Sequence, residues 1–282
     1  MDNVVIDDDY DHKDDTIEYI LENVLMPDDG SCEFGNLREL YNCKLVHSCT
    51  CTSQIKCCMD KESCCHGGRF KYHHSIVGKE LVLKHEIDLP AIIECSDLCG
   101  CSAEHCLNRC VQIGPRKQLE IFNSPLYRSL GLRTMIDIPA GAFVCEYAGE
   151  LLTLAEARRR LKLNDREEVM NYILCLNEYT NVSEAGSSKK LLVQSTIVDP
   201  SRRGNIGRYL NHSCQPNCDL KAVRVDSPVP KIGIFALRDI AAYEELCFHY
   251  GGDDPPTTVP SNAKPCLCSS SMCTGVMPNT TI

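Results

Sequence analysis

The chain has 282 residues, a length that suits one elaborated domain or two small ones, and 21 of these residues are cysteines. Its acidic start lacks the apolar stretch of a secretory signal, so we expect a protein that is not exported. No apolar run approaches the ~20 residues that a bilayer-spanning helix needs. In a reducing compartment, clustered cysteines are expected to bind zinc instead of pairing as disulfides.

The net charge of −10 resides in the first thirty residues, which hold eleven acidic residues against one lysine. The rest of the chain is balanced, so no basic stripe indicates direct binding of nucleic acid. We interpret residues 1–42 as a solvated acidic segment, with an arm for a basic partner as the alternative. Within it, Ile17, Ile20, Leu21 and Val24 recur at helical spacing and predict a short helix near 16–26.

Residues 43–112 lack a sustained apolar pattern and are rich in cysteine, so a metal cluster is expected to replace the hydrophobic core there. Tetrahedral zinc takes four thiolates, and the cysteine pairs are too close and too numerous for a simple zinc finger. Nine thiolates satisfy three zinc ions when three of the sulfurs bridge. The predicted ligands are Cys49, Cys51, Cys57, Cys64, Cys65, Cys95, Cys99, Cys101 and Cys106.

Cys58 is an almost equal alternative to Cys57 as a ligand. Cys32 and Cys43 lie outside the ligand spacing and are interpreted as structural thiols. Cys110 is expected to pack among apolar side chains instead of binding metal.

From about residue 113 the pattern changes to short strands and turns. Strands are expected at 142–147, 191–198 and 231–236, and a turn at 136–141. The run Thr153-Leu154-Ala155-Glu156 is a capping box that opens a helix to about Leu163. Strands this short and this frequent predict a β-rich α+β domain with few helices over 113–252, and not a doubly wound α/β fold.

Three runs carry the chemistry of this domain. They are Glu146-Tyr147-Ala148-Gly149-Glu150, the segment 205–217 with Arg208-Tyr209-Leu210-Asn211-His212-Ser213-Cys214, and Phe248-His249-Tyr250. Together with the flanking cysteines and in this order, they resemble the SET-domain protein lysine methyltransferases. The resemblance covers roughly 43–278 and is strongest to the branch that methylates lysine 9 of histone H3, in particular the SETMAR-type subgroup.

That resemblance implies a fold of small curled sheets with a C-terminal pseudoknot. It also implies a zinc-cluster pre-SET module at 43–112, a SET catalytic domain at 113–252 and a post-SET zinc segment at 253–282. In the post-SET site, Cys214 joins Cys266, Cys268 and Cys273 around a fourth zinc ion, which closes the C-terminal segment over the cofactor. Cys218 is expected to be a buried thiol near this site.

The resemblance further implies methyl transfer from S-adenosylmethionine to a lysine amine, which must be neutral although the pKa of free lysine is near ~10.4. A narrow apolar channel lowers that pKa by desolvation. Tyr250 would face the reacting centre, Tyr147 would align the amine, and Phe248 would leave room for di- or trimethylation. The implied cofactor-binding residues are Leu130, Gly131, Tyr172, Arg208, Tyr209, Asn211 and His212.

The expected substrate is the histone H3 tail or another basic peptide, and the expected location is the nucleus, on chromosomes, with further partners for chromatin targeting.

Four features depart from the family pattern: Ser129-Leu130-Gly131 replaces Gly-Trp-Gly, His249 replaces Asp, Val276 replaces an aromatic residue, and the Cys101–Cys106 spacing is one residue longer. The alternatives are a catalytically weak chromatin scaffold, a methyltransferase of a non-histone lysine, and a secreted disulfide-rich protein.

Overall fold

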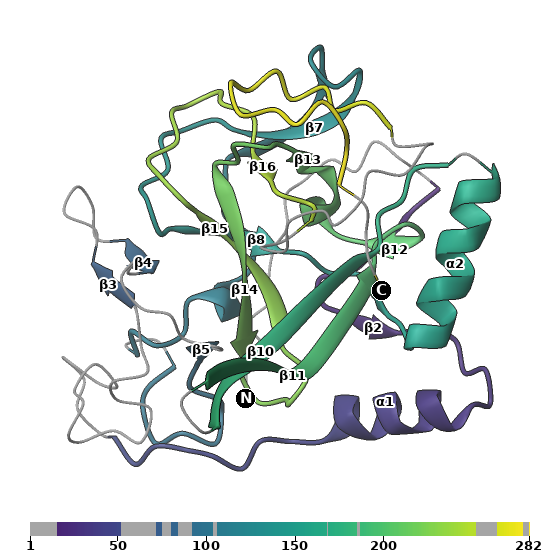
Figure 1. The fold of residues 1–282 in the computed structure, drawn as a ribbon. Coiled ribbons are helices and arrows are strands. Elements are labelled where there is room, and N and C mark those ends of the chain that lie inside the picture. Colours follow the sequence, from purple (N-terminus) through teal and green to yellow (C-terminus); the bar gives the residue numbers. More distant parts are fainter. Residues whose placement is uncertain are drawn as a thin grey trace.

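The computed structural model describes residues 16–51, 72–74, 80–83, 92–103, 106–167, 169–184, 187–251, 264–278 and 282. Figure 1 shows several short sheets that meet in the middle of the molecule, with the two α-helices at its outside. The helices are α1 (Cys32–Asn42) and α2 (Leu154–Glu167), and there are two 3-10 turns, η1 (Val111–Ile113) and η2 (Ile206–Tyr209).

The strands of the first half are β1 (Glu18–Tyr19), β2 (Val24–Leu25), β3 (Tyr72–His74), β4 (Leu81–Leu83), β5 (Ile92–Ile93), β6 (Leu119–Ser124), β7 (Ser129–Thr134), β8 (Phe143–Glu146) and β9 (Glu150–Leu151). The strands of the second half are β10 (Leu174–Glu184), β11 (Ser187–Asp199), β12 (Arg203–Gly204), β13 (Asn211–His212), β14 (Cys218–Arg224), β15 (Lys231–Ala236) and β16 (Cys247–Phe248).

In the described part of the chain no sheet has more than four strands. The two larger sheets have the orders β10-β11-β9-β2 and β5-β14-β15-β8, and the pairs β1-β12, β3-β4, β6-β7 and β13-β16 form separate small sheets. In the last of these, β13 and β16 run parallel, with Asn211 opposite Cys247 and His212 opposite Phe248. The β-rich fold with few helices is therefore confirmed.

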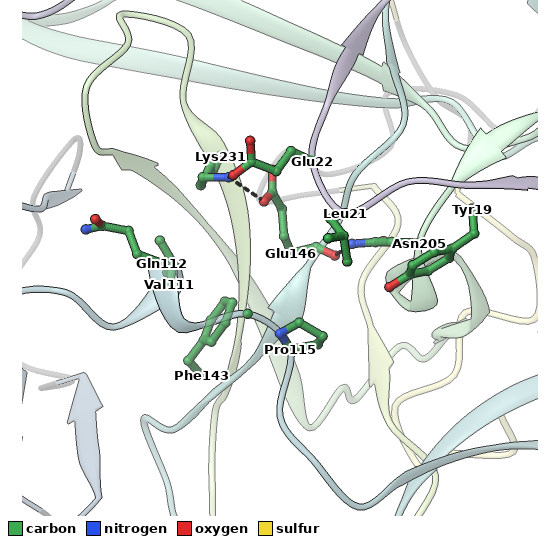
Figure 2. Close-up of a pocket in the computed structure, with 11 residues that line it drawn as sticks. Tyr19, Leu21, Glu22, Val111, Gln112, Pro115, Phe143, Glu146, Asn205 and Lys231 are labelled. Carbon is green, nitrogen blue, oxygen red and sulfur yellow. Dashed lines mark hydrogen bonds and ion pairs between the residues drawn. The ribbon is translucent and has the colours of Figure 1, made fainter. Parts of the chain in front are cut away.

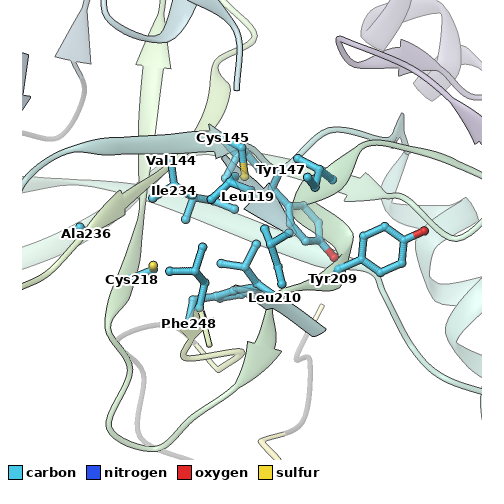
Figure 3. Close-up of a cluster of buried hydrophobic side chains, with 14 of the residues drawn as sticks. Leu119, Val144, Cys145, Tyr147, Tyr209, Leu210, Cys218, Ile234, Ala236 and Phe248 are labelled. Carbon is cyan, nitrogen blue, oxygen red and sulfur yellow. The ribbon is translucent and has the colours of Figure 1, made fainter. Parts of the chain in front are cut away.

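The largest apolar core lies between the sheet of β8 and β15 and the small sheets around it. Ile232 and Ile234 of β15 and Val144 of β8 are fully buried there, each contributing about 1.5–3 kcal/mol of transfer free energy. Figure 3 shows Tyr147, Leu210 and Phe248 among these side chains. The aromatic residues that the sequence predicts as site residues thus share a core with the apolar side chains of the sheet, which restricts their movement.

The predicted capping box does begin α2. The Thr153 hydroxyl accepts a hydrogen bond from the Glu156 amide at 3.2 Å, and the helix continues to Glu167, four residues beyond the predicted end. Its buried face carries Arg160, whose guanidinium pairs with Glu150 at 2.6 Å and Asp199 at 2.8 Å. These pairs join α2 to the neighbouring sheet and explain why a helix with little apolar surface remains docked.

The predicted helix near 16–26 is wrong. Residues 18–19 and 24–25 form β1 and β2, which pair in parallel with β12 and β9 respectively. Pairing with these distant strands overrides the local helical periodicity. A helix forms later instead, at α1, where the Ser31 hydroxyl accepts from the Phe34 amide at 3.0 Å. Cys32 and Cys43 lie at its two ends and are exposed.

The cysteine-rich segment is joined to the catalytic sheet through β5, which pairs in parallel with β14. Next to it, the fully buried Glu94 accepts hydrogen bonds from the Tyr72 hydroxyl at 2.8 Å and from the amides of Cys110 and Val111 at 2.8 and 2.9 Å. Cys110 packs in an apolar cluster with Val111 and Phe235, as predicted. Within the described residues, no helix is long and apolar enough to cross a membrane.

Candidate active site and metal centres

Four cysteines from two distant parts of the chain meet at the C-terminal end. The sulfur atoms of Cys214, Cys266, Cys268 and Cys273 all lie within 4.8 Å of one another, and Cys214 and Cys266 are 3.8 Å apart. Burial opposes ionisation of Cys268, but hydrogen bonds with Ser270 and from the Cys214 amide outweigh it and lower the pKa of its thiol to about 5, whereas burial raises the pKa of Cys266. A compact set of four sulfurs with a readily ionised member suits a closed tetrahedral zinc site.

A second group of sulfurs lies in the cysteine-rich segment. Cys49, Cys95, Cys99 and Cys101 have their sulfur atoms within 4.8 Å of one another, and Cys51 and Cys106 belong to the same cluster. Six of the nine predicted ligands are thus brought together. The other three, Cys57, Cys64 and Cys65, and the alternative Cys58, lie outside the described residues.

Polar groups surround the sulfurs of this second group. The Asn108 side chain donates to the Cys95 sulfur at 3.2 Å, and the Asn108 amide donates to the Cys106 sulfur at 3.4 Å. The buried guanidinium of Arg109 lies beside Cys101 and donates to the Ser96 carbonyl at 2.5 Å. A cation and several N–H donors next to clustered sulfurs offset the negative charge that thiolates bring, so the surroundings also fit a zinc cluster.

Three aromatic rings gather where β8, η2 and β16 meet. The Phe248 ring centroid lies 4.7 Å from that of Tyr250 and 5.9 Å from that of Tyr147. The Tyr250 hydroxyl donates to the Leu210 carbonyl at 2.7 Å, and the Tyr147 hydroxyl donates to the Tyr172 carbonyl at 2.6 Å. Burial raises the pKa of both tyrosines well above the usual value, so both hydroxyls remain protonated donors.

A buried cation lies between two of the predicted cofactor-binding tyrosines. The guanidinium carbon of Arg208 is 4.5 Å from the Tyr172 ring centroid and 5.1 Å from that of Tyr209. Its Nε donates to the Pro200 carbonyl at 3.0 Å. The Tyr172 carbonyl also accepts a hydrogen bond from the Tyr147 hydroxyl. Tyr172 therefore connects Arg208 to the cluster of aromatic rings.

Asn211 connects β13 to the start of β7, which holds the unusual Ser129-Leu130-Gly131 run. Its amide nitrogen donates to the Leu130 carbonyl at 3.2 Å and to the Glu245 carboxylate at 2.8 Å. A Cβ at Gly131 would lie 2.4 Å from a Glu245 carboxylate oxygen and 3.1 Å from the Asn211 amide nitrogen. A side chain at position 131 would therefore push the Glu245 carboxylate out of its place beside Asn211.

The side chain of His212 is engaged at both ring nitrogens. Nδ1 accepts from the Tyr250 amide at 3.2 Å, and Nε2 lies 3.4 Å from the Cys214 sulfur. Burial, and then the neighbouring His249, lowers the pKa of the imidazole to about 4, so the ring is neutral and carries its proton on Nε2. The ring thus links the four-cysteine group to Tyr250.

Two supporting residues received no role from the sequence. The Asn217 side chain donates to the Glu245 carbonyl and accepts from the Cys247 amide, both at 2.8 Å, which anchors β16. The Glu245 carboxylate accepts from Ser124 at 2.7 Å as well as from Asn211. Asn217 lies inside a motif that the sequence singles out, whereas Glu245 sits in an acidic pair with no signal of its own.

Comparison with known proteins agrees with this geometry. The SET domain family matches residues 129–251. A *Caenorhabditis elegans* protein named probable histone-lysine N-methyltransferase set-23 is 44% identical over 190 residues, which cover 66% of this chain and 72% of that protein. The chain belongs to the SET-domain family, among the members that carry the name histone-lysine N-methyltransferase.

One relative is human histone-lysine N-methyltransferase SETMAR, which is 41% identical to this chain over 196 residues. The match covers 66% of this chain and 27% of SETMAR. The chain spans between 27% and 60% of the length of the mammalian SETMAR proteins that it matches. The crystal structure of the methyltransferase domain of human SETMAR superimposes with a TM-score of 0.72 and 32% identity, over 93% of this chain and 89% of that one.

A second solved relative is *Arabidopsis thaliana* SUVH6 in complex with SAM, with a TM-score of 0.66 and 25% identity, over 95% of this chain and 51% of that one. In sequence, the protein named H3 lysine-9 specific SUVH6 is 32% identical over 255 residues, 80% of this chain and 30% of that protein.

Proposed function

We propose that the protein transfers methyl groups from S-adenosylmethionine to lysine 9 of histone H3 and adds two or three of them. The observation that carries the proposal is the cluster of the Tyr147, Phe248 and Tyr250 rings, joined through His212 to the four-cysteine group. The choice of lysine 9 follows from the likeness to SUVH6. A histone substrate implies that the protein acts on chromatin in the nucleus, together with targeting partners.

We also retain the module boundaries as part of this proposal: a pre-SET module at 43–112 with three zinc ions, a SET domain at 113–252 and a post-SET segment at 253–282 with one. Residues 1–42 precede them. The two sulfur groups support the metal sites, and the number of ions stays a prediction.

The buried aromatic rings suit the deprotonation of a lysine amine. Phe248 is 3% exposed and Tyr147 is 4% exposed, so an amine placed against them loses most of its hydration. Desolvation lowers the pKa of the amine and favours the neutral form that attacks carbon. The rings of Tyr147 and Tyr250 both contact Phe248, and their hydroxyls, which donate to the Tyr172 and Leu210 carbonyls, can accept from the N–H groups of the amine and so orient its lone pair.

The residues around Asn211 and Arg208 fit S-adenosylmethionine, which supplies an electrophilic methyl group on a positively charged sulfur. The ring of Tyr250 can attract such a cation, and the buried Arg208, which already lies over the Tyr172 ring, complements the carboxylate of the same ligand. The backbone of Leu130, Gly131, Asn211 and His212 and the ring of Tyr209 complete the proposed binding residues.

The test of the proposed function is methyl transfer by the purified, zinc-loaded protein to a panel of histone peptides that present different lysines. We expect label on the peptide that contains lysine 9 of histone H3. Label on another lysine would overturn the choice of substrate. Calorimetry with S-adenosylmethionine separates an enzyme from a chromatin scaffold, because a scaffold has no need to bind it.

Gly131→Ala is expected to weaken S-adenosylmethionine binding by about tenfold, or ~1.4 kcal/mol, because the added methyl group would displace Glu245 from Asn211. The dissociation constant is measured by calorimetry. Gly35→Ala in α1 is the matched control, since a Cβ there meets nothing within 4 Å. Equal affinities for the two variants would contradict the role of residues 129–131 in binding the cofactor.

Phe248→Tyr is expected to shift the main product from di- or trimethyl-lysine to monomethyl-lysine. The added hydroxyl would lie between Tyr147 and Tyr250 and would hold a hydrogen-bond partner that crowds the amine. Mass spectrometry of the peptide at equal turnover measures the product. Phe122→Tyr, whose ring faces Arg133 at 4.8 Å, makes the same chemical change elsewhere. An unmodified enzyme that stops at monomethyl-lysine would refute the prediction.

A further inference from the structure

Two buried asparagines form hydrogen bonds with the turn that carries Tyr147. Asn205 donates to the Glu146 carbonyl at 2.8 Å and accepts from the Ala148 amide at 3.3 Å. Asn23 accepts from the Gly149 amide at 3.0 Å and donates to the Glu146 carboxylate at 3.2 Å. Asn23 therefore contacts the residues on both sides of the Tyr147-Ala148 pair, and it is 8% exposed.

Asn23 comes from a part of the chain that lies outside the SET domain match at 129–251. It sits between β1 and β2, in a segment that we call the N-terminal strap (residues 18–26). The strap is docked at both ends, because β1 pairs with β12 and β2 pairs with β9. The Val24 amide also donates to the Gly149 carbonyl at 3.1 Å, so two consecutive strap residues bind the same glycine.

The turn has little freedom on its other side. A Cβ at Gly149 would lie 2.6 Å from the Asp199 carbonyl carbon, and a Cβ at Gly207 would lie 2.5 Å from the Glu146 carbonyl oxygen. Backbone from the β11–η2 region thus packs directly against the turn. A turn that is close-packed on one face and hydrogen-bonded on the other transmits any displacement of Asn23 to Tyr147.

The carboxylate that Asn23 contacts belongs to a small buried network. The Lys231 ammonium pairs with Glu146 at 3.0 Å and with Glu22 of the strap at 2.8 Å, and Figure 2 shows these three side chains together. Burial raises the pKa of Glu146, and the Lys231 ammonium opposes that effect. Glu146 is thereby provided with a cation on one oxygen and an amide donor from Asn23 on the other.

We propose that Asn23, which the N-terminal strap carries, is a positioning residue for Tyr147. The inference rests on the proposed function, in which the Tyr147 hydroxyl aligns the lysine amine. In this proposal Asn23 does not contact the substrate. It fixes the position of the turn and thereby the position of the Tyr147 hydroxyl, which donates to the Tyr172 carbonyl at 2.6 Å. A shift of the turn disturbs amine alignment while the residues around Asn211 stay in place.

The test compares four variants of the full chain in the peptide methylation assay. Asn23→Ala is expected to lower kcat by about 10- to 100-fold and to change the ratio of methylation products, with the KM for S-adenosylmethionine within about twofold. Glu22→Gln is the matched control, because it also alters the strap and a partner of Lys231 but leaves Asn23 on the turn. It is expected to retain the kcat of the unmodified protein.

Two further variants keep the inference testable if Asn23→Ala does not fold. Asn23→Asp keeps an acceptor for Gly149 but faces the Glu146 carboxylate, so it is expected to lower kcat. The double variant Asn23→Asp with Glu146→Gln has a donor again, now on residue 146. It is expected to recover at least about half of the loss in the logarithm of kcat. A purely structural role would instead lower the melting temperature and leave the product ratio unchanged.

The inference is overturned if Asn23→Ala and Glu22→Gln have the same kcat and product ratio, or if the double variant recovers nothing while remaining folded. An unmodified protein that methylates no peptide overturns the proposed function itself, and this result is distinct because it appears before any variant is compared.

Discussion

Tyr250→Phe is expected to lower kcat for peptide methylation by about 10²- to 10³-fold while leaving the protein folded. The change removes the hydroxyl that donates to the Leu210 carbonyl at 2.7 Å and that lies beside Phe248, where the amine is proposed to react. The carbonyl loses its partner, which costs about 1–3 kcal/mol of unfolding free energy. Methyl transfer is measured at saturating peptide and cofactor, and folding by thermal melting.

Tyr243→Phe is the control for this change, since Tyr243 is 63% exposed and lies seven positions earlier in the same part of the chain. We expect it to have the activity of the unmodified protein. If Tyr250→Phe retained more than about a tenth of that activity, its hydroxyl would have no role in the transition state, and Tyr147 would have to align the amine alone.

Removal of metal is expected to abolish both S-adenosylmethionine binding and methyl transfer. Structural zinc contributes about 10–16 kcal/mol of apparent binding free energy in small thiolate sites, and this energy becomes folding energy. At the C-terminal site the loss would free Cys214, and with it the His212 ring that holds the Tyr250 amide. Metal content is measured by elemental analysis before and after chelation, and cofactor binding by calorimetry.

Substitution of single cysteines separates the effect of losing metal at one sulfur group from the effect of losing it at the other. Cys268→Ser is expected to lose one zinc ion and the activity, whereas Cys95→Ser is expected to destabilise the cysteine-rich segment. Cys43→Ser is the matched control, because this thiol is exposed and lies in neither group. A chain that is free of metal, folded and fully active would refute the proposal that the sulfur groups are zinc sites.

The parts of the fold that the sequence predicts well are those with strong local signals. The strand at 231–236 matches β15 residue for residue, because five of its six residues are buried and turn residues bound it. The start of α2 follows from a hydroxyl that caps it locally. The grouping of Cys214 with Cys266, Cys268 and Cys273 could be predicted only because the family motif connects residues more than fifty positions apart.

The parts that the sequence does not predict depend on distant partners. Residues 18–19 and 24–25 form strands because β12 and β9 lie beside them, and nothing in their own spacing indicates this. α1 has only Phe34 buried, too few contacts to give a helical apolar stripe. Asn23 belongs to no recognisable sequence motif, and its partners Glu146 and Gly149 lie 123 and 126 positions away, so its role could not be predicted from the sequence.

The parallel pairing of β1 with β12 has a consequence for how the protein is made. Glu18 leaves the ribosome long before Arg203, its partner across the ladder, has been synthesised. At translation speeds of 5–20 residues per second, the early strand waits roughly 10–40 s for that partner. Docking of β1 therefore follows the synthesis of Arg203, so a polypeptide that ends before this residue lacks one of the two pairings that hold the segment of Asn23.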